Sequence, residues 1–79
     1  MKTFKLIITK IDSPIFDGDA VSVTIPGEEG EMTVLAGHEA LITRLKPGTI
    51  TVQAEAGKST HEVGSGVVEI ANNIVTVLL

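Results

Sequence analysis

A histidine lies in the middle of an otherwise apolar stretch, in the triplet Gly37-His38-Glu39. Imidazole is the side chain best suited to act as a general base or metal ligand near neutral pH. The other candidate ligands, Glu31, Glu39 and His61, show none of the clustered spacing that is typical of metal sites. With no thiol or phenol in the chain, catalysis would require a histidine to meet distant carboxylates. We therefore expect neither an enzyme nor a metal site, and a polar turn between two strands explains the triplet.

A second motif with chemical potential is Gly64-Ser65-Gly66. A phosphate-binding loop would need a helix to begin directly after it, whereas residues 67–70 continue as a predicted strand. A nucleophile elbow would need a glycine two positions before the serine, and that position is Val63. We expect a β-bulge or a close approach of strands instead.

Lys58 follows Gly57 at a predicted hairpin tip. Small β domains that carry a lipoyl or biotinyl group present a lysine at such a tip. In those families the lysine lies between Asp and Ala or between two Met residues, whereas Lys58 lies between Gly57 and Ser59. A solvated lysine is the favoured interpretation, and a carrier domain and a generic β adaptor remain open as alternatives.

Length and charge restrict the function further. The chain has 79 residues, no cysteine and a net charge of −4. A single small domain covering residues 1–79 is expected, and an acidic domain is a poor match for nucleic acid or anionic lipid. The apolar run near the N-terminus is too short for a signal peptide or a membrane span, so we expect a soluble intracellular domain.

Turn signals recur roughly every ten residues, which is the spacing of an all-β sandwich or barrel. Asp17-Gly18 predicts a β-hairpin between two strands. Pro26-Gly27 and Pro47-Gly48 predict type II turns in which the glycine takes a positive φ. Residues 55–58 predict a hairpin tip, and Asn72-Asn73 suits a type I′ turn because asparagine tolerates the left-handed region.

Apolar residues alternate with their neighbours in several segments, as in strands that bury one face. The alternating sets are Phe4, Leu6 and Ile8; Ile50, Val52 and Ala54; and Val75 and Val77. No segment has a helical period, so we predict one antiparallel β-sandwich. Surplus apolar residues at Ile7, Ile74, Leu78 and Leu79 indicate that either a second sheet or a partner covers the other face of these strands.

A series of motifs resembles the N-terminal domain of the ε subunit of F-type ATP synthase. The matching segments are residues 26–31, 36–43 and 45–48, joined by Phe16-Asp17-Gly18, residues 66–70 and residues 72–78. The resemblance covers essentially the whole chain in order. It is specific, because scattered turn motifs rarely reproduce this series at matching spacing.

The resemblance implies a small β-sandwich that in the family is followed by a C-terminal helical hairpin. That hairpin carries an inhibitory latch and, in some members, binds ATP. None of its residues lies in this sequence, so we expect neither self-inhibition nor nucleotide binding, and no cofactor. Alanine stands at positions 36 and 40, where the family usually has proline, Thr33 stands where glycine is common, and Ser65 replaces the first glycine of a pair.

The resemblance also implies site residues. The turns at Gly30-Glu31 and Gly37-His38-Glu39 would project from one end of the sandwich onto the polar loops of the c-ring, with Glu31 and His38 as contacts. Ile42, Thr43 and Arg44 match a segment that lies against the γ subunit. The plainer alternatives are a solvated carboxylate for Glu31, backbone contacts within its own turn for His38, and a place in the core for Leu41 and Ile42.

The function implied is that of a non-catalytic rotor subunit in the central stalk of ATP synthase. Such a subunit links γ to the c-ring and couples proton flow to ATP synthesis. Its expected location is peripheral, on the cytoplasmic face of a bacterial inner membrane or an equivalent energy-transducing membrane. No nucleic-acid partner and no direct membrane insertion are expected.

Overall fold

Residues 2–79 are described by the computed structural model, and they form nine β-strands and no helix. None of the described segments is a helix able to span a membrane. The strands are β1 (Phe4–Thr9), β2 (Pro14–Ala20), β3 (Ser22–Gly27), β4 (Gly30–Leu35), β5 (Leu41–Leu45), β6 (Gly48–Ala54), β7 (Gly57–Val63), β8 (Gly66–Ala71) and β9 (Ile74–Leu78).

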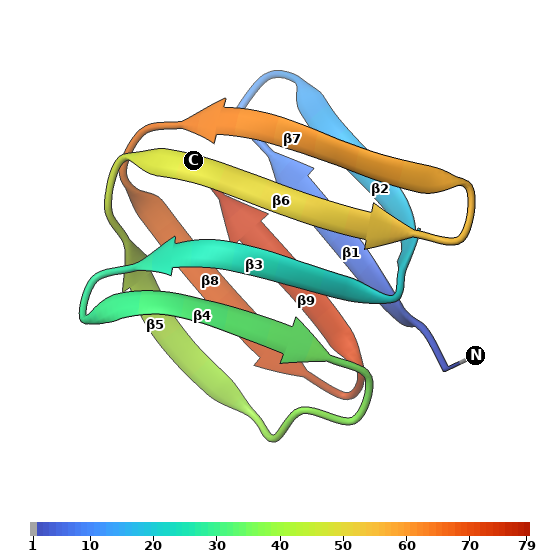
Figure 1. The fold of residues 1–79 in the computed structure, drawn as a ribbon. Coiled ribbons are helices and arrows are strands. Elements are labelled where there is room, and N and C mark those ends of the chain that lie inside the picture. Colours follow the sequence, from blue (N-terminus) through green and yellow to red (C-terminus); the bar gives the residue numbers. More distant parts are fainter. Residues whose placement is uncertain (1) are drawn as a thin grey trace.

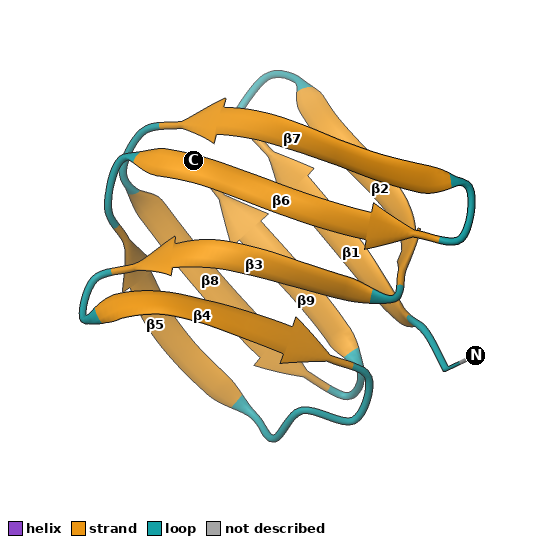
Figure 2. Cartoon of the chain, viewed as in Figure 1, coloured by secondary structure: helices purple, strands orange, loops and turns teal. Residues whose placement is uncertain are grey.

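The strands lie in two layers that cross at an angle (Figure 1). The front layer has the order β7-β6-β3-β4, and the back layer has the order β2-β1-β9-β8-β5. A single backbone pair, Gly27 with Leu45, connects β3 to β5 and joins the layers along one rim. Loops occur only where strands end (Figure 2), so strand pairing determines the shape of the domain. The predicted β-sandwich is confirmed.

One strand pair departs from the predicted antiparallel arrangement. β1 and β9 pair in parallel, from Lys5 opposite Ile74 to Thr9 opposite Leu78. The β8–β9 hairpin fixes the direction of β9, and the free side of β1 then accepts β9 in parallel. The first and last strands therefore lie side by side inside the back layer (Figure 1).

The core lies between the two layers and follows the predicted alternation. Each fully buried aliphatic side chain contributes about 1.5–3 kcal/mol relative to an exposed one. No polar or charged residue is buried among the described residues. The buried residues are Phe4, Leu6, Ile8, Ala20, Val23, Ile25, Val34, Leu45, Ile50, Val52, Val68, Ile70, Val75 and Val77.

The hairpin predicted at Asp17-Gly18 was wrong, because both residues lie inside β2. β2 pairs with β1 across this position, with Asp17 opposite Ile7 and Gly18 opposite Leu6. Continuous pairing of the two strands overrides the local turn preference of the dipeptide. The chain instead reverses at residues 10–13, where the amide of Lys10 donates to the carbonyl of Ser13 at 2.9 Å.

The two type II turns predicted at Pro-Gly pairs were also wrong. Pro26 and Gly27 are the last residues of β3, and the turn that follows is formed by Glu28 and Glu29. Neither Gly27 nor Gly48 has a positive φ. A Cβ on Gly48 would lie 3.0 Å from the Cβ of Pro26, so glycine is required there for close packing. The connection at Lys46-Pro47 does end β5 and precede β6 as expected.

Two other turns are present where the sequence placed them. β6 and β7 form a hairpin whose turn residues are Glu55 and Ala56. Asn72 and Asn73 join β8 to β9 with φ values of 52° and 62°, as a type I′ turn requires.

Gly64-Ser65 connects β7 to β8, and Gly66 begins β8. A Cβ on Gly66 would overlap the carbonyl oxygen of Leu78 on the neighbouring strand. The motif therefore allows strands to approach closely, as expected, and residues 67–70 continue as strand.

Substituting Gly66→Ala is expected to lower the free energy of unfolding by about 1–3 kcal/mol, because the added methyl group must displace backbone of β9. Gly64→Ala is the matched control, since a Cβ there meets nothing within 4 Å. Denaturant unfolding of the two variants measures the difference. Equal stability of Gly66→Ala and the parent would contradict the close approach of β8 and β9.

Candidate functional site

The loop between β4 and β5 holds His38 through its own backbone. The ring Nδ1 of His38 lies 2.7 Å from the carbonyl oxygen of Glu39. Because a carbonyl can only accept, Nδ1 carries the proton in this contact. The amide of His38 donates to the carbonyl of Leu35 at 3.3 Å. The ring thus satisfies a backbone group of its turn, and no bond from Nε2 to another described residue is present.

Asn73 ties this loop to two distant segments. Its Oδ1 accepts a hydrogen bond from the amide of Gly37 at 2.9 Å, and its Nδ2 donates to the carbonyl of Thr3 at 2.9 Å. Gly37 has a φ of 81°, a value that favours glycine. The side chain of Asn73 therefore positions the loop that carries His38. The sequence predicted only the turn at Asn73, because a contact across 36 residues leaves no local signal.

Glu31 lies near the start of β4, with its side chain exposed. β4 pairs only with β3, so it forms a free edge of the front layer. His38 lies beyond the other end of β4, which corrects the expectation that both residues project from one end of the sandwich. The reason is the length of β4, whose six residues separate the two turns by about 20 Å.

The segment Ile42–Arg44 lies in β5 and divides between two faces. Ile42 is 70% exposed and Arg44 is exposed, and their partners on β8 are Glu69 and Val67. Thr43 is half-buried and lies opposite the buried Val68, so it points inward. Side chains alternate along a strand, so the three cannot share one surface. The alternative that placed Ile42 in the core was wrong.

The outer face of the back layer carries an apolar surface, which we call the apolar face. Strand pairing places Val67 opposite Leu78 and Ala71 opposite Ile74. Ile42 lies opposite Glu69 and Ile7 lies opposite Thr76, so polar side chains interrupt the apolar members. Ile42 is the most exposed of them, and Leu78 is 53% exposed. Its members are Ile7 on β1, Ile42 on β5, Val67 and Ala71 on β8, and Ile74 and Leu78 on β9. Ile7, Ile74 and Leu78 were singled out from the sequence as surplus, whereas Val67 was missed.

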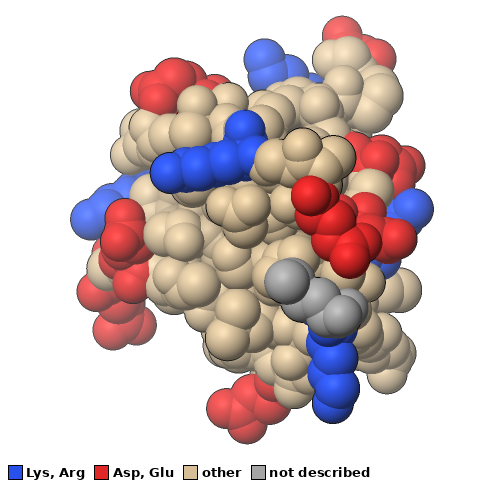
Figure 3. Space-filling model, turned by 45° about the vertical axis from the view of Figure 1, so that its right-hand side comes forward, with Lys and Arg blue, Asp and Glu red and all other residues tan. Residues whose placement is uncertain are grey.

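The outer face of the front layer is polar. Four threonines, Thr33, Thr24, Thr51 and Thr60, lie directly opposite one another across β4, β3, β6 and β7, and we call them the threonine row. The hydroxyls of Thr24 and Thr33 lie 3.0 Å apart. In the space-filling view, charged side chains lie mainly around the rim of the molecule (Figure 3). The two outer faces therefore differ in kind, one apolar and the other hydroxyl-bearing.

An ion pair lies at the edge of the apolar face. Nζ of Lys5 lies 2.8 Å from a carboxylate oxygen of Asp17. The hydrogen bond that the Lys5 ammonium donates to this carboxylate, followed by the negative charge of Asp17, raises the pKa of the Lys5 amino group above its ordinary value. Both side chains are about half exposed, so the pair limits the apolar face on the β2 side without adding much stability.

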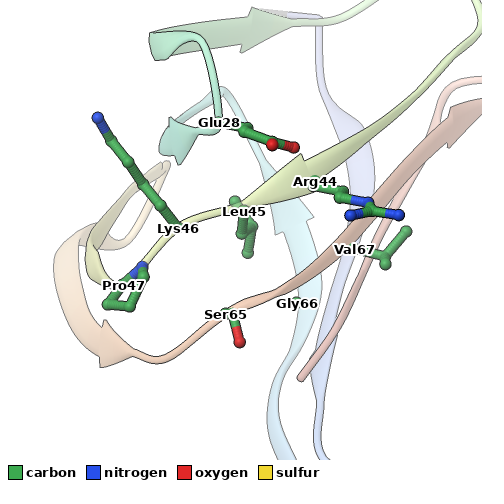
Figure 4. A pocket seen from close by; sticks show the side chains of 8 residues that line it. All are labelled: Glu28, Arg44, Leu45, Lys46, Pro47, Ser65, Gly66 and Val67. Atoms are coloured by element: carbon green, nitrogen blue, oxygen red, sulfur yellow. The ribbon is translucent and has the colours of Figure 1, made fainter.

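A surface hollow of about 550 Å³ lies where the β3–β4 turn, the end of β5 and the β7–β8 connection meet. Lys46 points away from the hollow and the guanidinium of Arg44 lies beside Val67 (Figure 4). Its polar groups do not converge on one point, as they do in a ligand-binding pocket. The hollow therefore gives no support for a bound ligand.

The remaining candidates for chemistry also stay separate. Within residues 2–79, no group of three or more metal-ligating side chains is close enough to hold an ion. His61 lies against Phe16, with ring centroids 6.0 Å apart, and its Nε2 is 3.2 Å from Oγ of Ser59. Lys58 lies in β7, two positions beyond the hairpin turn it was expected to occupy.

Comparison with known proteins gives a consistent result. The family described as "ATP synthase, Delta/Epsilon chain, beta-sandwich domain" matches residues 3–79. A curated relative, the ATP synthase epsilon chain of Bordetella petrii, is 40% identical over 79 residues, which is 99% of this chain and 56% of the relative. The chain thus spans a little over half the length of that relative.

Solved structures agree with the sequence match. A chain of the Euglena gracilis mitochondrial ATP synthase, in a structure of OSCP, F1 and c-ring, superposes with a TM-score of 0.89 at 32% identity over 96% of this chain and 49% of that chain. A chain of the Tetrahymena thermophila mitochondrial ATP synthase central stalk and c-ring has a TM-score of 0.79 at 14% identity, covering 94% of this chain and 60% of that chain. The second match shows a common fold.

Replacing Asn73 with glycine tests its hold on the β4–β5 loop. Asn73→Gly keeps the positive φ but removes both side-chain bonds, so the amide of Gly37 should exchange with solvent roughly twofold to tenfold faster, as expected for the loss of one hydrogen bond. Asn72→Gly is the control, because the side chain of Asn72 makes no hydrogen bond to another described residue, unlike that of Asn73. Hydrogen exchange followed by NMR measures both. Unchanged exchange at Gly37 in Asn73→Gly would refute this role.

Proposed function

Because this chain belongs to the ATP synthase delta/epsilon chain β-sandwich family, we propose that it is a non-catalytic subunit of the ATP synthase central stalk. In this role it links the γ subunit to the c-ring and couples proton flow to ATP synthesis. The observation that carries the proposal is the apolar face of the back layer, combined with the family match across residues 3–79.

The apolar face is the surface we assign to γ. Ile42, Val67, Ile74 and Leu78 are each at least 40% exposed, which is unusual for a cluster of aliphatic residues on one sheet. Arg44 and Glu69 lie on the same face and would meet complementary charges on the partner. Thr43 points inward, so in this proposal Ile42 and Arg44 make the contact and Thr43 supports β5 from beneath.

The rim formed by β4 and the loop after it is the surface we assign to the c-ring. Glu31 lies near the start of β4 and His38 lies beyond its end, so the contact runs along β4. Glu31 would accept charge-assisted hydrogen bonds from basic groups on the ring. The Nδ1 proton of His38 is already donated to Glu39, which directs Nε2 toward a partner as an acceptor.

A central-stalk subunit connects γ and the c-ring mechanically, and this role requires no reactive side chain. A subunit that transmits torque must resist deformation between its two contacts, and a close-packed core between two layers provides that stiffness. The subunit would be peripheral and would lie on the cytoplasmic face of a bacterial inner membrane or its equivalent, because the c-ring loops are reached from that side.

Substituting Ile42→Asp should weaken binding to γ by about tenfold to a hundredfold, because it replaces the most exposed aliphatic side chain of the apolar face with a second negative charge opposite Glu69. Thr51→Asp is the matched control, since it places the same charge in the threonine row on the opposite outer face. Calorimetric titration against purified γ from the same source measures both. Equal loss of binding in the two variants would remove the assignment of γ to the apolar face.

Substituting Glu31→Lys in the assembled enzyme should lower proton-driven ATP synthesis several-fold, because a positive charge then faces the basic groups of the c-ring loops. Because Glu31 is exposed, the free energy of unfolding of the isolated variant should stay within about 0.5 kcal/mol of the parent, as measured by thermal unfolding. ATP synthesis equal to that of the parent, in a fully assembled complex, would count against the c-ring contact.

A further inference from the structure

β7 is an edge strand with unpaired backbone groups. It ends the hydrogen-bonded path of strands and pairs only with β6. In this hairpin the closing pair Ala54 and Gly57 exchanges hydrogen bonds, and such pairs recur at every second position. The amides and carbonyls of Lys58, Thr60 and Glu62 therefore point away from β6. No other described backbone group bonds to them.

The side chains along this edge are self-complementary. Lys58, Thr60 and Glu62 are all exposed on the outer face, with a positive charge at one end, a negative charge at the other and a hydroxyl at the centre. One oxygen of the Glu62 carboxylate accepts a hydrogen bond from the hydroxyl of Thr49 on β6, which leaves the other oxygen for a partner. If a second β7 lies antiparallel to the first with the two Thr60 residues opposite, each Lys58 faces the other copy's Glu62. No like charges are directly opposite in this register.

We propose that two copies of this chain pair through β7 as an antiparallel, two-fold dimer. The Thr60 residues of the two copies exchange both of their backbone hydrogen bonds across the symmetry axis, as opposite residues do in an antiparallel ladder. The two Lys58–Glu62 pairs flank them on either side. The threonine row of one front layer then continues into the threonine row of the other.

The same charges exclude other assemblies. A parallel, in-register stack of β7 strands would place Lys58 beside Lys58 and Glu62 beside Glu62, which is unfavourable. Charged edge residues are a common means of preventing open-ended pairing. In β7 they disfavour a fibre and favour a closed pair, since the paired edge leaves no second β7 edge free.

The other edge of the front layer is a poorer candidate. By the same logic the outward backbone groups of β4 belong to Glu31, Thr33 and Leu35, and the carbonyl of Leu35 already accepts a hydrogen bond from the amide of His38. Pairing two copies about Thr33 would place the carboxylate of Glu31 opposite the apolar Leu35, without a compensating positive charge. Charge complementarity therefore assigns self-pairing to β7. Pairing there leaves β4 and the apolar face uncovered, so this inference does not depend on the proposed function.

An apolar group lies beside the proposed interface. Ile11 has a relative exposure of 101% and lines a hollow of about 470 Å³ with Glu62 and Val63 at one end of β7.

A paired strand of seven residues is only about 23 Å long. The interface is therefore at the small end of the range for specific complexes, and we expect a weak, concentration-dependent dimer.

Sedimentation velocity from about 10 μM to about 1 mM tests the proposal over the range expected for a small interface. The parent chain should shift from monomer to dimer, and added salt should weaken the dimer by screening the Lys58–Glu62 pairs. A chain that stays monomeric throughout, or that forms larger species without a dimer plateau, would overturn the proposal.

The substitution Thr60→Pro tests the role of the β7 edge separately from the stability of the domain. Thr60→Pro removes an amide that points away from β6, so the fold should persist while the dimerisation constant falls at least about tenfold. Thr33→Pro is the matched control, because it removes the outward amide of the other threonine edge of the same layer. Loss of the dimer in Thr33→Pro and its retention in Thr60→Pro would assign pairing to β4 and refute the proposal.

Charge exchange provides a test that does not rely on proline. Lys58→Glu and Glu62→Lys should each weaken the dimer about tenfold by placing like charges opposite each other. The double variant should restore the dimer, because opposite charges then face each other again with their positions exchanged. Failure of the double variant to dimerise, with circular dichroism equal to the parent, would contradict the Thr60-centred register.

Discussion

Burial of one side of every strand against a single shared core is the constraint on which the rest of this domain depends. Fourteen aliphatic or aromatic residues fill the space between the layers, and no charged or polar residue among those described is buried with them. The described residues form two layers, so the outer faces of both layers are exposed in this structure. One outer face is apolar and the other bears hydroxyls, so the two faces of the domain are chemically distinct.

The core was predictable because alternation is a local pattern with a physical cause. Leu6, Ile50 and Val75 are each inward-facing as the period of two required. The backbone conformation of a turn was predictable at Asn72-Asn73, because asparagine tolerates the left-handed region. The hairpin predicted at Asp17-Gly18 was wrong because the preference of this dipeptide for a turn is weaker than the pairing of β2 with β1. Nothing in the local sequence reveals that pairing.

The candidate site was less predictable than the fold. Ile42 and Ile70 are the same residue type, yet one is 70% exposed and the other is 2% exposed. Only the register between β5 and β8, which places Ile42 opposite Glu69, distinguishes them. The hold of Asn73 on the loop of His38 likewise depends on a contact between distant segments. Resemblance to a family supplied Ile42 and His38 as candidates. The face on which each residue lies depends on strand register and on contacts between distant segments, which the sequence does not reveal.

The parallel pairing of β1 with β9 has a consequence for biosynthesis. β1 emerges first from the ribosome, but one of its two neighbours in the back layer is the last strand of the domain. The hydrophobic side chains of β1 can complete their packing only after β9 has been synthesised. Such contacts between segments that are distant in sequence slow folding. Until β9 is available one edge of β1 has no partner, and unpaired strand edges favour aggregation.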